Sequence, residues 1–326
     1  MQATMNTPLH FRSTTFSGPQ PGTKLIVLGA VHGNETCGTQ AIQRMLAEFE
    51  SGQRQLCRGS VTFVPVTNPL AYARQARSGD RNLNRCLFPN AQPQDYEDRI
   101  ANWLCPLLAA HDVLLDLHSF HTDGDPFALM GPLDNNGALQ PFAHAAAEEA
   151  LALRLGVHRF VDGWLETYAS GIAHRQQHPA HYPATLPPAQ LDVRYGIGTT
   201  EYMRTRGGWG ITLECGQHDE AQAPAVAYQA IANTLAHLAL VDAPLPTPAA
   251  DPQHLRMVTV TDRYDSGDRF ARRWQSFDFI PQGEAIGWRA DGSVVTAAHD
   301  AYILFPNPDA EPGAEWFYLA QQSDRF

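Results

Sequence analysis

The feature that most constrains the fold is the alternation of short apolar runs with helical patterns over the first 240 residues. Apolar runs rich in β-branched and aliphatic residues occupy 24–31, 61–66, 113–117 and 210–213. Apolar residues recur at three- and four-residue spacing within 36–50, 96–110, 141–155 and 223–241. Buried strands that alternate with amphipathic helices are typical of an α/β domain with a largely parallel sheet.

A proline-rich stretch at 243–253 separates this pattern from a different one. The stretch holds four prolines and has no apolar periodicity, as expected for a linker. Beyond it, short β-like runs are separated by Gly and Asp turns, at 257–261, 284–290, 294–297, 301–305 and 316–319. We therefore predict a domain of residues 1–245 and a small all-β domain of residues 246–326. Between 167 and 208 the periodicity weakens, and we expect irregular loops there.

Composition excludes several classes of protein. Of the 326 residues, 44% are hydrophobic and 17% charged, which suits a folded core and excludes a disordered or fibrous chain. The net charge of −11 argues against nucleic acid or an anionic membrane as a partner. The five cysteines include no CxxC pair, and no apolar run has the length of a signal peptide or membrane helix. We therefore expect a soluble, cytoplasmic protein.

Three polar clusters each follow a predicted strand. They contain His32 and Glu35, then Asp116 and His118, then Glu214. Open α/β sheets bind ligands at the carboxyl ends of their strands, so these side chains can meet. Two imidazoles and one carboxylate are a ligand set of hydrolytic zinc sites, and a second carboxylate nearby can act as a general base. Taken singly, each cluster is more often a group of ordinary polar residues.

A fourth cluster is an arginine-rich loop at 77–85. Arg77, Arg81 and Arg85 lie within nine residues of a chain that is otherwise poor in Arg and Lys. Arginine is the preferred bidentate partner of a carboxylate, and Asn84 adds an amide donor. The loop is therefore either a binding element for a carboxylate-bearing ligand or a solvated basic loop.

In their order along the chain, the HGNE, LNR, DLHS and LECG motifs resemble the succinylglutamate desuccinylase/aspartoacylase family, a branch of the zinc carboxypeptidase-like fold. The motifs span residues 29–216, and the runs at 300–303 and 315–318 are similar to the small β domain of that family. The resemblance implies an α/β/α layered domain with a mostly parallel mixed sheet, followed by a small C-terminal all-β domain.

The resemblance also implies a cofactor and catalytic groups. One zinc ion per chain would be held by His32, Glu35 and His118. Glu214 would activate the attacking water, and Arg77 would polarise the scissile carbonyl.

Substrate contacts are implied in the same way. Asn84 and Arg85 would bind the carboxylate of the amino acid, and Arg204 would bind substrate carboxylate as well, with Arg206 as a close rival. A C-terminal tyrosine lines the pocket in aspartoacylase-like members. Its candidate counterparts here are Tyr168, Tyr195, Tyr302 and Tyr318.

We therefore predict a zinc-dependent deacylase that cleaves the amide bond of a small N-acyl amino acid, with no nucleic-acid or membrane partner. The alternatives are a metallocarboxypeptidase or peptide amidase, or a non-catalytic zinc-binding homologue. Exposed strand edges of the β domain could pair with a second copy of the chain, so a homo-oligomer is a further alternative. The sequence also leaves open the acyl group, the amino acid and the role of His174, His178 and His181, which could bind a second metal.

Overall fold

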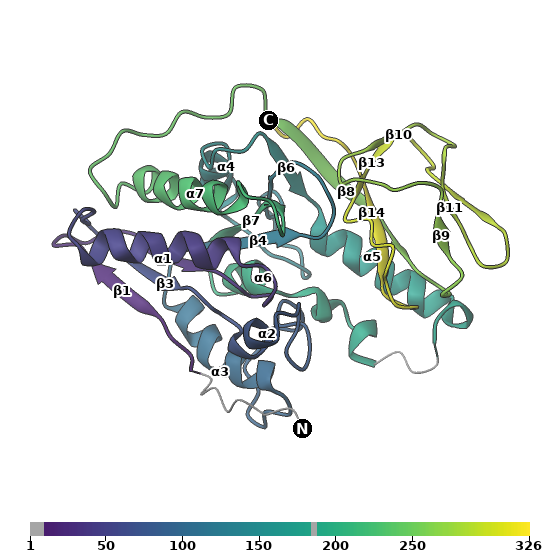
Figure 1. Ribbon diagram of the computed structural model, residues 1–326, viewed down its shortest axis with the longest axis horizontal. Coiled ribbons are helices and arrows are strands. Elements are labelled where there is room, and N and C mark those ends of the chain that lie inside the picture. Colours follow the sequence, from purple (N-terminus) through teal and green to yellow (C-terminus); the bar gives the residue numbers. More distant parts are fainter. Residues whose placement is uncertain (1–9, 184–187) are drawn as a thin grey trace.

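One long mixed sheet runs through most of the molecule (Figure 1). The computed structural model describes residues 10–183 and 188–326. The strands of this sheet are β1 (Thr14–Ser17), β2 (Lys24–Leu28), β3 (Ser60–Val64), β4 (Val113–Phe120), β5 (Phe127–Leu129), β6 (Arg159–Asp162), β7 (Trp209–Gln217), β8 (Gln253–Asp262), β10 (Phe279–Ile280), β13 (Ala301–Leu304) and β14 (Glu315–Gln322). Within the described ranges, their order is β1-β3-β2-β4-β7-β5-β6-β8-β14-β13-β10.

Helices connect these strands. They are α1 (Cys37–Glu50), α2 (Pro69–Arg74), α3 (Tyr96–Ala109), α4 (Ala145–Ala152), α5 (Trp164–Gln177), α6 (Thr199–Thr205) and α7 (Ala223–His237), with short 3-10 turns η1 (Pro179–His181), η2 (Pro188–Leu191) and η3 (Val193–Gly196). Among the described residues, no helix combines the length and the apolar character needed to cross a membrane.

The two faces of the sheet are covered by different helices (Figure 1). Successive side chains of a strand point to opposite faces. In β2, Leu25 and Val27 share a hydrophobic core with α1 and α7, whereas Ile26 and Leu28 share one with α3 and α6. The predicted α/β/α layering is therefore confirmed, with a mostly parallel mixed sheet at its centre.

Strand direction brings the polar clusters to one edge. β3, β2, β4 and β7 are neighbours and run parallel, so their carboxyl ends lie together. His118 of β4 is directly opposite Glu214 of β7 in this register. The segment after β2 carries His32 and Glu35 to the same place. The sheet thus gathers residues from three distant motifs.

The C-terminal strands extend the main sheet. β8 pairs in parallel with β6, and β14, β13 and β10 follow as antiparallel neighbours. A second small antiparallel sheet contains β9 (Arg269–Phe270), β11 (Ala285–Trp288) and β12 (Val294–Thr296). The additional small β sheet completes the expected fold class. The domain boundary near residue 245 stays a prediction, although residues 238–252 contain no helix or strand.

The stretch at 167–208 is more regular than we expected. It contains most of α5 and all of α6. The buried face of α5 has Leu165, Tyr168 and Ile172 at helical spacing, but it also includes Thr167, Gly171 and Arg175, which weaken the apolar pattern by which an amphipathic helix is recognised. Residues 184–187 of this stretch lie outside the described residues.

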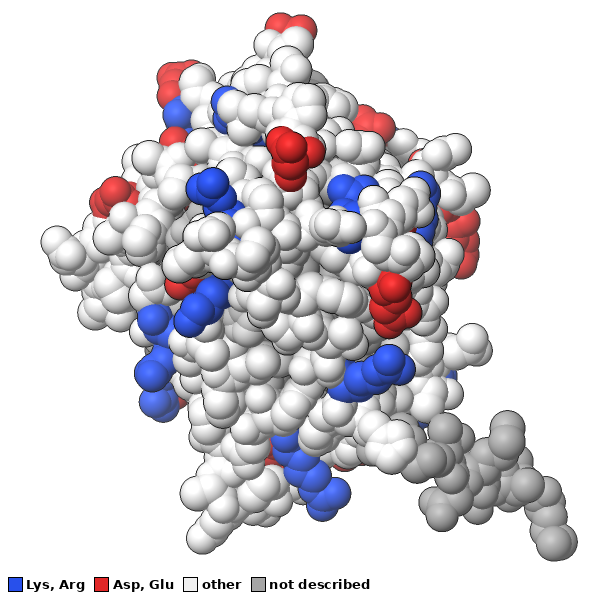
Figure 2. All heavy atoms as spheres, turned by 90° about the vertical axis from the view of Figure 1, so that its left-hand side faces the viewer, with Lys and Arg blue, Asp and Glu red and all other residues white. Residues whose placement is uncertain are grey.

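Charged side chains on the face around β1 and α1 are scattered over a mainly uncharged surface (Figure 2). Neither sign forms a continuous patch in that view. This face therefore offers no strongly charged docking surface.

Candidate metal centre and active-site pocket

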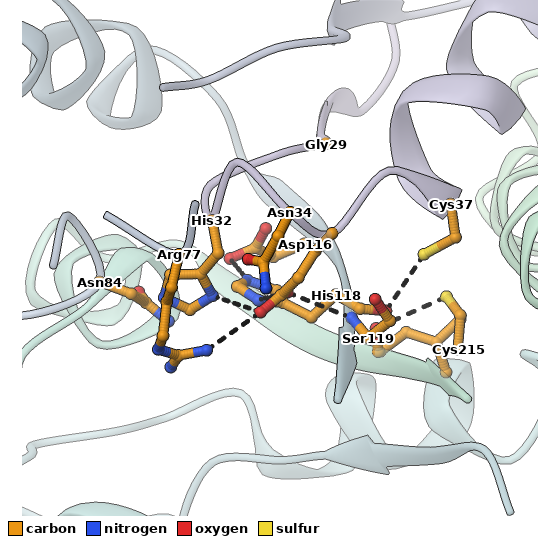
Figure 3. Close-up of polar contacts among 12 residues, drawn as sticks. Gly29, His32, Asn34, Cys37, Arg77, Asn84, Asp116, His118, Ser119 and Cys215 are labelled. Carbon is orange, nitrogen blue, oxygen red and sulfur yellow. Dashed lines mark hydrogen bonds and ion pairs between the residues drawn. The ribbon is translucent and has the colours of Figure 1, made fainter. Parts of the chain in front are cut away.

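A buried group of two imidazoles and one carboxylate lies at the carboxyl edge of the sheet (Figure 3). Nδ1 of His32 is 2.8 Å from Oε1 of Glu35, and Nδ1 of His118 is 2.9 Å from Oε2 of the same carboxylate. One ligand atom from each residue lies within 4.8 Å of the others. This arrangement could hold a metal ion with nitrogen and oxygen ligands.

Backbone geometry after β2 aims His32 and Glu35 into this group. Ala30 adopts a left-handed conformation with φ of 46°, which costs about 1 kcal/mol or more for a residue with a Cβ. A Cβ on Gly33 would lie only 2.0 Å from the backbone of Ala71 in α2, so this position requires glycine. The HGNE segment is therefore held by a strained turn and a close backbone contact.

The second ring nitrogen of each histidine, Nε2, also has a polar neighbour. Nε2 of His32 is hydrogen-bonded to Oδ1 of Asn82 at 3.0 Å. Nε2 of His118 is 3.0 Å from Oδ2 of Asp116, although the contact lacks hydrogen-bond geometry. Such partners orient metal-binding imidazoles. Asp116 has the place we expected for an orienting residue, whereas the contact of Asn82 was not anticipated.

The pKa values of His32 and Glu35 suit a cation, whereas His118 would have to give up a proton. Burial lowers the pKa of His118, but the nearby carboxylates of Asp116 and Glu35 outweigh it and raise the pKa well above its usual value, so a metal ion would compete with this proton. Burial, reinforced by the charge of Arg77, lowers the pKa of His32 to about 4, which keeps this imidazole neutral. Burial alone raises the pKa of Glu35, but the neighbouring His32 and His118 outweigh it and hold the pKa well below its usual value. Nε2 of His118 and Oε2 of Glu214 are buried without hydrogen-bond partners among the described residues. These residues fit a divalent metal ion.

Glu214 and Arg77 come from distant parts of the sequence, and both line the cavity beside the group. Burial raises the pKa of Glu214 to about 8, and the charge of Glu35 adds to this effect while His118 opposes it. Nη1 of Arg77 donates to Oε1 of Glu35 at 3.1 Å (Figure 3). The side chain of Arg77 is 53% exposed. Arg77 can therefore move from this contact toward a ligand.

A cavity of about 430 Å³ opens at this group. Seven of the eight predicted site residues line it, namely His32, Arg77, Asn84, Arg85, His118, Arg204 and Glu214. Glu35, the eighth, contacts both histidines. A larger hollow of about 590 Å³ lies elsewhere, beside Asp125 and Asp219, and has none of these residues. We place the candidate site in the smaller cavity because it contains the buried ligand group.

Arg85 is held in the cavity by aromatic rings. Its guanidinium carbon lies 4.7 Å from the ring centre of Trp164 and 5.8 Å from that of Tyr168. Nη1 donates to the backbone oxygen of Asn84, and Oδ1 of Asn84 accepts from the backbone N–H of Thr199. The remaining N–H groups of Arg85 have no hydrogen-bond partner among the described residues, so they can bind a carboxylate.

The C-terminal strands supply residues that we had not assigned. Glu315 and Tyr318 of β14 line the cavity, and Tyr318 is buried with no partner for its hydroxyl in the described part of the chain. Oε1 of Glu315 lies 3.8 Å from Nη2 of Arg175. Of our four candidate tyrosines, Tyr318 is the one that lines the cavity. The EWFY run at 315–318 was recognisable in the sequence as part of the β domain. The sequence did not show that Glu315 lies close enough to Arg85 for their charges to interact.

The cluster of His174, His178 and His181 forms no comparable centre. The rings of His174 and His178 stack at 4.3 Å, and those of His178 and His181 at 5.6 Å. Over residues 10–183 and 188–326, the His32–Glu35–His118 group is the set of three ligating side chains close enough to share one ion.

Comparisons with known proteins agree with this geometry. Residues 21–153 match the family described as the succinylglutamate desuccinylase/aspartoacylase catalytic domain. An N-acyl-aromatic-L-amino acid amidohydrolase of Rattus norvegicus is 36% identical over 113 residues, which cover 31% of this chain and 34% of that protein. A probable aspartoacylase of Prochlorococcus marinus is 31% identical over 101 residues, covering 29% of this chain and 33% of that protein. The matched stretch thus spans about one third of these relatives.

The fold comparison extends further than the sequence matches. A succinylglutamate desuccinylase/aspartoacylase structure from Rhodobacter sphaeroides superposes with a TM-score of 0.69 at 18% identity, over 96% of this chain and 90% of that one. The resemblance expected from the four motifs is therefore confirmed: residues 21–153 match the catalytic domain of the succinylglutamate desuccinylase/aspartoacylase family in sequence, and nearly the whole chain has the fold seen in a structure of that name.

Proposed function

We propose that this protein is a zinc-dependent hydrolase that cleaves the amide bond of an N-acyl amino acid to give an amino acid and a carboxylic acid. The observation that carries the proposal is the buried His32–Glu35–His118 group, which lies beside Glu214 in a cavity that also contains Arg85. The names of the matched relatives, an N-acyl-aromatic-L-amino acid amidohydrolase and a probable aspartoacylase, support an amide-cleaving activity.

His32, Glu35 and His118 would hold one zinc ion per chain. When bound, zinc supplies a Lewis acid that polarises the amide carbonyl and lowers the pKa of water. Glu214 takes the proton of the attacking water and then delivers it to the leaving amine. Its place opposite His118 in the strand register, within the same cavity, suits a group that transfers a proton between water and the leaving amine.

Two arginines have separate tasks in this scheme. Arg77 is partly exposed and close to Glu35, so its guanidinium can stabilise the negative charge that develops on the carbonyl oxygen. One such donor is typically worth about 3 to 4 kcal/mol. Arg85 and Asn84 bind the carboxylate of the amino acid, which positions the scissile bond before attack. Arg204 lines the far part of the same cavity.

The test combines metal content with turnover. Purified protein is assayed against N-acetyl and N-succinyl amino acids and against peptides, before and after chelation and after zinc is restored. We expect about one zinc per chain and a chelator-sensitive release of free amino acid. Turnover of peptides alone would identify a carboxypeptidase or peptide amidase instead. Bound zinc without any turnover would identify a non-catalytic homologue.

We also propose that the protein acts in the cytoplasm. All five cysteines are free thiols in the structure, and free thiols are usual in a reducing compartment.

A further inference from the structure

The far end of the cavity contains an arginine whose charge is already matched. Arg204 is 2% exposed at its side chain, and Glu148 is fully buried. Nη2 of Arg204 donates to Oε1 and Oε2 of Glu148 at 3.1 Å each, and Nε donates to Oε2 at 3.3 Å. Nη2 also donates to the backbone oxygen of Gly210 at 2.7 Å. Two of the three guanidinium nitrogens are therefore fully engaged within the protein.

Glu148 is held in place independently of Arg204. Its carboxylate also accepts from the backbone N–H groups of Gly131 and Gly210. A Cβ on Gly131 would lie 2.5 Å from Nε of Arg204, so the backbone comes close to the guanidinium on that side. The pair cannot separate without breaking several buried hydrogen bonds, which are costly to leave unmade.

A second carboxylate faces the remaining nitrogen. Oε1 of Glu201 lies 3.6 Å from Nη1 of Arg204, and Glu201 lines the cavity. Oε2 of Glu201 accepts from the backbone N–H of Gly198 at the start of α6, which fixes the side chain. One guanidinium thus faces two carboxylates. The cavity walls beside it, at Leu129, Met130 and Thr212, are uncharged.

Arg85 presents the opposite situation. It stacks on aromatic rings, and in the described part of the chain it makes no ion pair within 4.0 Å and one hydrogen bond, to the backbone of Asn84. Glu315 also lines the cavity, and its charge acts on Arg85 from beyond 4.0 Å, but it takes up none of the donors of Arg85. The fork of donors therefore remains available to a ligand. Arg85 and Arg204 therefore differ in what they can bind.

We propose that the cavity accepts one substrate carboxylate, at Arg85, and rejects a second one at the Arg204 end. This inference rests on the proposed function. The substrates are then N-acyl amino acids whose side chain and acyl group both lack a carboxylate. Family resemblance assigns Arg204 to a substrate carboxylate, but in this chain its contacts with Glu148 and Glu201 make it a positioning residue, at an end of the cavity where carboxylates outnumber cations.

The test uses substrates of equal size that differ in charge. Values of kcat/KM are measured for N-acetyl-asparagine against N-acetyl-aspartate, and for N-acetyl-glutamine against N-acetyl-glutamate. We expect the amide member of each pair to be favoured at least about tenfold, which corresponds to about 1.4 kcal/mol. Equal or higher values for the acidic members would overturn the inference.

A matched pair of variants identifies the cause. Glu201→Gln keeps the size of the side chain and an oxygen for the cap of α6, but removes the second negative charge. We expect it to narrow the preference at least about threefold, mainly through KM of the acidic member. Glu284→Gln removes the same charge from an exposed residue that does not line the cavity and should leave the preference unchanged. An unchanged preference in Glu201→Gln would contradict the assigned cause.

Binding of products separates this inference from the proposed function. Calorimetry with free asparagine and free aspartate measures the same discrimination without turnover. Weaker binding of aspartate would support the inference even if no N-acyl amino acid were hydrolysed, a result that would refute only the proposed function. Tighter binding of aspartate than asparagine would refute the inference while leaving hydrolysis untouched.

Discussion

The two walls of the cavity are built in different ways. The ligand wall, which we define as His32, Glu35, His118 and Glu214, comes from the ends of adjacent parallel strands and their following turns. The substrate wall, which contains Arg85, Trp164, Glu315 and Tyr318, is assembled from a loop, a helix and the last strand of the chain. The comparison suggests that the chemistry depends on local motifs, whereas substrate choice depends on packing between distant segments.

The largest effect is expected from a change in the ligand wall. Glu35→Gln keeps the side-chain volume but removes the charge that both histidines face. Metal content should fall below about one tenth of the wild-type value, and kcat/KM should fall at least about a thousandfold, because the metal supplies several kcal/mol. Elemental analysis and amide hydrolysis measure both. Glu50→Gln, at the exposed end of α1, is the matched control. A variant that keeps one metal per chain would contradict the ligand role.

Glu214→Gln should separate chemistry from metal binding within the same wall. Loss of a general base lowers kcat by about 10²- to 10⁴-fold, whereas metal content should stay at the wild-type level because Glu214 is not one of the three ligands. Single-turnover assays together with elemental analysis test this pair of outcomes. Full activity in the variant would remove Glu214 from the proposed mechanism.

A change in the substrate wall should affect KM more than kcat. Arg85→Gln removes a charge-assisted contact worth about 1.5–3 kcal/mol, so KM should rise about 10- to 100-fold with metal content unchanged. Arg85→Lys should fall between this variant and the wild type because it keeps the charge but loses the donor fork. Arg99→Gln, which changes an exposed arginine of α3 that does not line the cavity, is the control. A loss confined to kcat would break the distinction between the two walls.

The smallest effect concerns the stability of the C-terminal strands. Asp268 is buried and accepts from Nη1 of Arg289 and from the backbone N–H groups of Tyr264 and Ala290. Burial raises the pKa of Asp268, but these hydrogen bonds outweigh it and lower the pKa below its usual value. A depressed folded-state pKa stabilises the protein above the usual value of 3.8 and loses that contribution as the pH falls further.

Asp268→Asn should therefore lower the free energy of unfolding at pH 7 by about 1–3 kcal/mol. The difference from the wild type should shrink as the pH falls below 3.8. Urea titrations across this range measure it. A difference that stays constant with pH would show that the charge of Asp268 contributes nothing.

The ligand wall could be predicted from the sequence because its residues lie within a few positions of recognisable apolar runs: His32 and Glu35 come shortly after β2, and His118 and Glu214 come directly after the apolar parts of β4 and β7. His118, for example, is set opposite Glu214 by strand register alone. The contacts of Arg204 could not be predicted in this way. Its partner Glu148 is an ordinary glutamate within an alanine-rich helix, and only the packed structure shows that it is fully buried.

The fold shows the same division. Strands such as β2 and β4 are continuous apolar runs and were recognisable, whereas β5 and β6 have three and four residues and carry too little pattern. Helix α5 was missed because its buried face mixes apolar residues with Thr167, Gly171 and Arg175, and the burial of Arg175 depends on a long-range ion pair with Asp262 of β8.

The parallel pairing of β6 with β8 has a consequence for how such a protein can be divided. A chain ending near residue 245 would leave β6 as an exposed edge strand. Its unpaired backbone donors and acceptors would promote aggregation. The C-terminal strands are therefore an integral part of the main sheet and not a separable module. The contribution of β14 to substrate preference would therefore have to change by single substitutions, such as at Glu315 or Tyr318, since exchange of the whole C-terminal segment would break the sheet.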